Sequence, residues 1–101
     1  MYLRGVIDTC YFLGRYHEAI SWAERALMHA PNDQFALWML ASSAARVGDA
    51  DRTGRALEVI RGGNWNTVSK VEQFLSMRFR YRKEELKREV LDGLRLAGLG
   101  E

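Results

Sequence analysis

Two glycines, Gly14 and Gly48, lie 34 residues apart, and each separates two stretches in which apolar residues recur at helical spacing. Ala23 and Leu57 keep the same interval on the second stretch of each pair. A period of this length is typical of stacked helical hairpins, because each hairpin buries its apolar face only against the next one. The spacing therefore predicts an all-α chain of antiparallel hairpins.

Helical periodicity continues past the second glycine and predicts about six helices in all, the last two over residues 68–79 and about 82–97. Gly14, Gly48 and Gly98 suit helix ends, because glycine adopts the left-handed conformation at low cost. The remaining boundaries are expected at Pro31, at Asn32 or Asp33, at Asp49 or Asp51, at Gly62, and at Ser69 with Glu72 as a capping box.

Residues 13–20, LGRYHEAI, are followed at fixed spacing by Ala23, Ala26 and Pro31. Small residues here let two helices approach closely, and the proline stops the second helix before the next repeat. This pattern resembles the tetratricopeptide repeat family, and residues 34–61 with the glycine loop after them match it more loosely. The resemblance implies one domain, folded as a short right-handed solenoid. Its units are expected at residues 1–33 (repeat one), 34–66 (repeat two) and 67–101 (a divergent capping hairpin).

The last helical stretch ends in residues 91–99, LDGLRLAGL. This ending resembles the C-terminal tetratricopeptide region of bacterial proteins that carry a class III adenylate or guanylate cyclase. The cyclase domain needs metal-binding aspartates on a βαβ sheet, and this sequence has no such pattern. The resemblance therefore implies a non-catalytic regulatory or assembly module, the C-terminal part of a larger bacterial protein.

Side chains suited to catalysis are few. Cys10 falls on the apolar stripe of the first helix, and His17 and His29 lack the spacing of metal ligands. We therefore expect no enzyme activity, cofactor, metal or small-molecule substrate. A single cysteine allows no internal disulfide, which fits a cytoplasmic setting. No membrane partner is expected either, since no apolar run approaches the roughly 20 residues of a spanning helix.

The family resemblance also implies a partner-binding groove, because the first helix of each tetratricopeptide hairpin lines the inner face. The third helix is apolar over nearly its whole circumference, and Phe35, Trp38 and Met39 are left over once its buried stripe is assigned. Such a helix must be covered on more than one side, so either the tail hairpin or a partner covers these three. The expected groove residues are Arg4, Asp8, Tyr11, Phe12, Phe35, Trp38, Met39, Ser42 and Arg46.

The chemistry of this groove favours an apolar partner. Family members that clamp a C-terminal carboxylate use asparagine where this chain has Asp8 and Met39, and an aspartate repels a carboxylate. We therefore expect a protein-interaction or oligomerisation module that binds an apolar segment of another protein or a second copy. The alternatives are a structural cap or spacer for a neighbouring catalytic domain, and nucleic-acid binding through the basic and aromatic residues 78–83. For that segment a solvated turn is the simpler interpretation.

Overall fold

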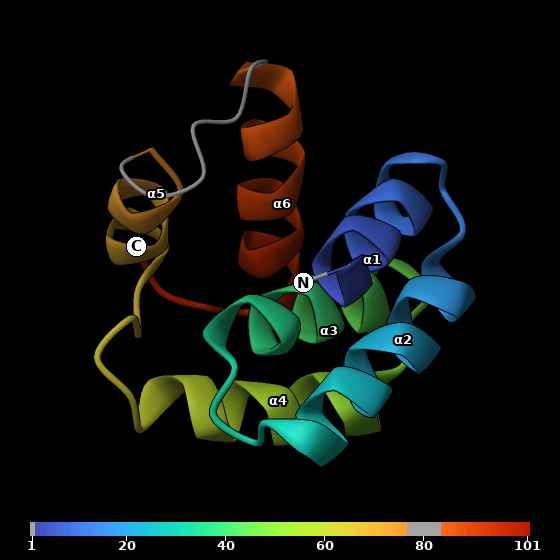
Figure 1. The fold of residues 1–101 in the computed structure, drawn as a ribbon. Helices are drawn as coiled ribbons and strands as arrows, with labels where there is room; N and C mark the ends of the chain where they lie inside the picture. Colours follow the sequence, from blue (N-terminus) through green and yellow to red (C-terminus); the bar gives the residue numbers. More distant parts are fainter. Residues whose placement is uncertain (1, 77–83) are drawn as a thin grey trace.

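The computed structural model describes residues 2–76 and 84–101, and within them the side chains of residues 6–76 and 87–101. The described residues form helices and no strand (Figure 1), which confirms the prediction of an all-α chain. The helices are α1 (Tyr2–Phe12), α2 (Tyr16–His29), α3 (Gln34–Arg46), α4 (Ala50–Arg61), α5 (Val68–Phe74) and α6 (Glu84–Ala97). None of these described helices is long and apolar enough to cross a membrane.

Three helices end in the same glycine turn. Gly14, Gly48 and Gly98 have φ angles of +79°, +77° and +107°, in the left-handed region that glycine adopts without strain. At each turn, the residue after the glycine donates its backbone N–H to a carbonyl five residues earlier, which satisfies the last helical carbonyls. These bonds are Arg15 to Cys10 (2.8 Å), Asp49 to Ala44 (2.9 Å) and Leu99 to Leu94 (3.0 Å). The three predicted helix ends are confirmed.

Side-chain caps begin α3, α4 and α5, whereas α2 has none. Asp33 Oδ1 accepts the Ala36 N–H at 3.2 Å, and Asp49 Oδ1 accepts the Arg52 N–H at 3.1 Å, so one of the two predicted residues caps each helix. At α5 the prediction of a capping box at Ser69 is wrong. Thr67 is the cap, and its Oγ1 accepts the Lys70 N–H at 3.2 Å.

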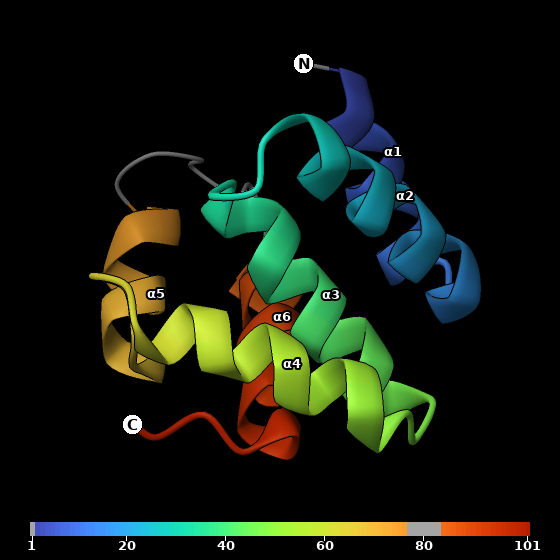
Figure 2. The same ribbon diagram turned by 90° about the horizontal axis from the view of Figure 1, so that it is seen from below.

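Helix α3 is the centre of the fold. It packs against α1, α2, α4 and α6, and every residue from 35 to 44 is buried. Its neighbours α2 and α4 lie along one side of it, and α6 crosses the other side (Figures 1 and 2). This arrangement explains the apolar circumference of α3, because a helix surrounded by other helices needs apolar residues all round.

The tail does not extend the row of helices beyond α4. Helix α6 packs mainly on α3 and only slightly on α4, and in Figure 1 it stands between α5 and α1. Residues 99–101 then return to the start of α5, where Val68 N–H donates to Gly100 O at 2.7 Å and Ser69 N–H to Glu101 O at 3.1 Å. These bonds satisfy donors that every helix N-terminus leaves open, and they tie α5 to α6.

Candidate functional site

The expected inner groove is filled by the chain itself. The side chains of Tyr11, Phe35, Trp38, Met39 and Ser42 are each 3% exposed or less. The sequence left open whether the tail or a partner covers this face, and in this structure the tail contacts Tyr11, Trp38 and Ser42 directly. The Trp38 ring packs edge to face on the ring of Phe74 in the tail helix α5, with 5.1 Å between the two centroids.

A partly buried polar cluster links α6 of the tail to α1 and α3. Tyr11 Oη lies 2.6 Å from Ser42 Oγ and donates to the Glu89 carbonyl of α6 at 2.8 Å. Arg46 donates to the same carbonyl at 2.8 Å and to Tyr11 Oη at 3.3 Å. If the Ser42 hydroxyl donates to Tyr11, the phenol oxygen accepts hydrogen bonds from Ser42 and Arg46 and donates one to the Glu89 carbonyl. All of its hydrogen-bonding positions are then used. Burial raises the pKa of Tyr11, although the Ser42 and Arg46 hydrogen bonds act against that shift.

A glycine in α6 makes this cluster sterically feasible. A Cβ added at Gly93 would overlap Ser42 Oγ and lie 2.7 Å from Tyr11 Oη. Because a helical side chain covers the turn that precedes it, the missing side chain leaves the Glu89 carbonyl, four residues earlier, open to Tyr11 and Arg46. The close approach of α6 to α3 therefore depends on glycine at this position.

The other predicted groove residues are only partly brought together with this cluster. Phe12 is half-buried, and its ring packs edge to face on Tyr11 with centroids 5.3 Å apart. Asp8 is half-buried on α1, and the side chain of Arg4 lies outside the described residues. Residues 78–83, considered above for nucleic acid, also lie outside them.

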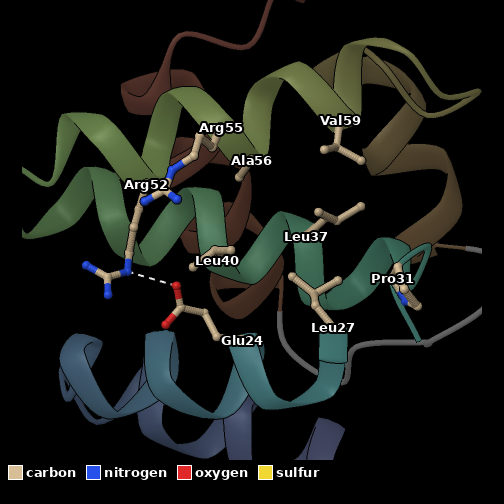
Figure 3. Close-up of a pocket in the computed structure, with 9 residues that line it drawn as sticks. All are labelled: Glu24, Leu27, Pro31, Leu37, Leu40, Arg52, Arg55, Ala56 and Val59. Carbon is tan, nitrogen blue, oxygen red and sulfur yellow. Dashed lines mark hydrogen bonds and ion pairs between the residues drawn. The ribbon is translucent and has the colours of Figure 1, made fainter. Parts of the chain in front are cut away.

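An open groove lies between α2 and α4, on the side of α3 turned away from α6 (Figure 3). Its volume is about 240 Å³. Leu37 and Leu40 of α3 lie at its base, between Leu27 of α2 and Val59 of α4. The remaining lining residues are Glu24, Pro31, Arg52, Arg55 and Ala56. An apolar base with charges confined to one end is the usual composition of a binding groove.

An ion pair bridges one end of this α2–α4 groove. Arg52 Nε on α4 lies 2.9 Å from Glu24 Oε2 on α2, and Arg52 Nη1 lies 2.8 Å from Asp49 Oδ2. The Asp49 hydrogen bond, followed by the Glu24 hydrogen bond, raises the pKa of Arg52, which keeps this guanidinium charged. Because the pair is well exposed to solvent, it contributes little stability. It links α2 and α4 at that end of the groove.

One apolar side chain that lines this groove is well exposed to solvent. Val59 of α4 is 48% exposed. The sequence did not point to this site, because Val59 falls outside the buried stripe of its helix. An apolar residue beside that stripe was the available signal.

The remaining chemistry of the described residues is sparse. They contain no group of three histidine, cysteine or acidic residues that could hold a metal ion. Cys10 is half-buried against the core, while His17 and His29 are exposed. No protein-family model, curated protein or solved structure matches the chain.

Proposed function

We propose that the chain is a non-catalytic protein-interaction module and that the α2–α4 groove is its docking surface for an apolar segment of another protein. The observation that carries this proposal is a hollow of about 240 Å³ with an apolar base, lined on one side by Val59, which is 48% exposed. Exposed apolar groups around a concave surface are typical of interaction sites, since water is released from both surfaces on binding.

The groove favours a segment with one or two large apolar side chains. Leu27, Leu37 and Val59 offer branched aliphatic surface to such a side chain, while the Glu24–Arg52 pair bounds the groove at one end. Pro31 marks the other end in Figure 3, so a bound segment would lie along the gap between α2 and α4. Charged positions in the ligand are expected only beyond the apolar part, where Arg55 is exposed.

The helix order and the glycine turns support keeping the tetratricopeptide-like resemblance as part of this proposal. In that interpretation α1–α2 and α3–α4 are the two repeats, and α6 fills the inner groove that other members leave for a ligand. The resemblance of residues 91–99 to cyclase-associated tails further supports a regulatory or assembly part of a larger bacterial protein that acts in the cytoplasm.

Selection from a displayed library of short random peptides tests the docking proposal. Peptides enriched on the wild-type chain should carry large apolar residues and should lose binding to Val59→Asp. The matched control is Leu13→Asp, which makes the same change at an apolar side chain that is 64% exposed and outside the groove. Both substitutions should leave stability within about 0.5 kcal/mol of the wild type, as is usual at surface positions. Peptides that bind Val59→Asp as well as the wild type would contradict the assignment.

A structural cap or spacer is the second candidate. It is favoured by the burial of the inner face under the chain's own α6, together with the hydrogen bonds that residues 99–101 make to α5. A module of this kind satisfies its own surfaces and needs no ligand. It would yield no enriched peptide in the same selection.

A further inference from the structure

Gly54 lies in the middle of α4 and has no packing role among the residues that the structure describes. A Cβ added there meets none of their atoms within 4 Å, whereas one at Gly93 collides with α3. Glycine inside a helix is destabilising, because it loses more backbone entropy on folding than alanine does. The packing of the described residues therefore gives no reason for glycine at this position.

Gly54 borders a second apolar hollow, of about 330 Å³, between α4 and the end of α6. Leu57 of α4 and Leu96 of α6 stand beside it, and Leu96 is 63% exposed. The other lining residues are Ala45, Gly48, Ala50, Thr53 and Ala97. A projecting leucine next to a shallow hollow with small residues is self-complementary, as a two-fold contact between identical surfaces requires.

We propose that this α4–α6 face binds a second copy of the chain, with the two α4 helices antiparallel. If they cross between Gly54 and Leu57, the exposed Leu96 side chain of each copy faces Gly54 of the other. The absence of a side chain at Gly54 then lets the helices reach the short end of the usual 8–10 Å separation. This face is distinct from the α2–α4 groove, so one chain could pair with a copy and still bind a ligand.

Charge complementarity selects a second copy as the occupant. α4 carries the exposed Asp51 in its first turn and the exposed Arg61 in its last turn. An antiparallel crossing places Arg61 of each copy next to Asp51 of the other, and it also sets the two helix dipoles in opposite directions. A parallel contact would instead bring like charges together. Such rim charges mainly fix orientation and raise the association rate.

The proposed contact is confined to α4 and the end of α6, so we expect a reversible dimer. A stable interface takes about 800 Å² from each copy, roughly an eighth of the 6062 Å² that this chain exposes. α4 and the last turn of α6 supply one elongated strip of that surface. We therefore expect association that depends on concentration.

Sedimentation of the full chain over a range of concentrations tests this proposal. The wild type should form dimers, and Gly54→Ala and Leu96→Ser should each raise the dimer dissociation constant at least tenfold. At high dilution Gly54→Ala should raise the melting temperature by about 4 °C, since it improves helix propensity without a clash. Ser21→Ala, at an exposed position of α2, is the matched helix-stabilising control and should leave the dissociation constant unchanged.

A wild type that stays monomeric at every concentration would overturn the proposal. Dimers that tolerate both Gly54→Ala and Leu96→Ser would overturn it as well, since they form elsewhere. Val59→Asp distinguishes the two sites. It should abolish peptide binding in the α2–α4 groove and leave dimerisation intact, so either proposal can fail without the other.

Discussion

Replacing Gly93 with alanine is the sharpest perturbation of the contact between α6 and α3. The new Cβ would overlap Ser42 Oγ, and it would lie 2.7 Å from Tyr11 Oη and 2.9 Å from Ser42 Cβ. Both neighbours are buried and hydrogen-bonded, so neither can swing away without loss. The substitution must therefore displace α6 from α3.

The cost follows from three contributions. Overpacking a filled interior costs about 1–3 kcal/mol. Moving α6 also weakens the hydrogen bonds from Tyr11 and Arg46 to the Glu89 carbonyl, at about 1 kcal/mol each. Alanine returns about 1 kcal/mol through its better helix propensity. We expect Gly93→Ala to lower the free energy of unfolding by about 2–4 kcal/mol.

Urea unfolding followed by circular dichroism measures this loss, and the midpoint should fall by about 2 M. At a dilution where the chain is monomeric, Gly54→Ala is the internal control, because the same chemical change in an uncrowded helix position should raise the midpoint. Combining Gly93→Ala with Ser42→Gly should cost less than the two changes added together, since the second removes the atoms that the new methyl meets. A Gly93→Ala chain as stable as the wild type would refute the proposed packing.

Further substitutions test the buried face. Tyr11→Phe should cost about 1–2 kcal/mol, because it leaves Ser42 and the Glu89 carbonyl without their shared partner. Burial raises the pKa of Tyr11, so the folded chain favours the neutral phenol. The stability that this side chain contributes to the fold is therefore complete below about pH 10, and it is lost as the pH rises through the raised pKa. The stability difference between wild type and Tyr11→Phe should narrow over that range in denaturation series. Trp38→Ala should lower the free energy of unfolding by about 3–5 kcal/mol, as expected for a core residue, and urea unfolding measures the loss. An unchanged urea midpoint would show that Trp38 is not a core residue.

Local features of the fold could be predicted from the sequence. Gly14, Gly48 and Gly98 end helices by their own conformational freedom, and Asp33 and Asp49 cap helices by side chains that reach only three residues ahead. Such signals involve few neighbouring residues, so spacing alone identifies them. The cap of α5 was misassigned because Thr67, Ser69 and Glu72 all suit a helix start, and the choice depends on where the chain turns from extended to helical.

The candidate site could not be predicted in the same way. The apolar excess on α3 was visible, but its cover comes from a helix some 50 residues later in the sequence, whose approach depends on Gly93 meeting Ser42. Sequence periodicity shows only that a glycine lowers the stability of a helix. It therefore does not distinguish Gly54, which has no close neighbour among the described residues, from Gly93, which contacts Ser42. The α2–α4 groove also depends on the distance between two helices. The sequence of either helix by itself does not determine that distance.

The location of a bound ligand is the most direct test of the proposed docking surface. Backbone chemical shifts of the labelled chain should be measured as an apolar peptide, selected on the wild type, is added. We expect the changes to concentrate around Leu27, Ala56 and Val59, with the amides of α6 still protected from exchange and the Trp38 indole resonance unmoved. Changes centred on Trp38 and Met39, accompanied by loss of protection in α6, would show that the inner face is the binding site and that α6 is displaced from it.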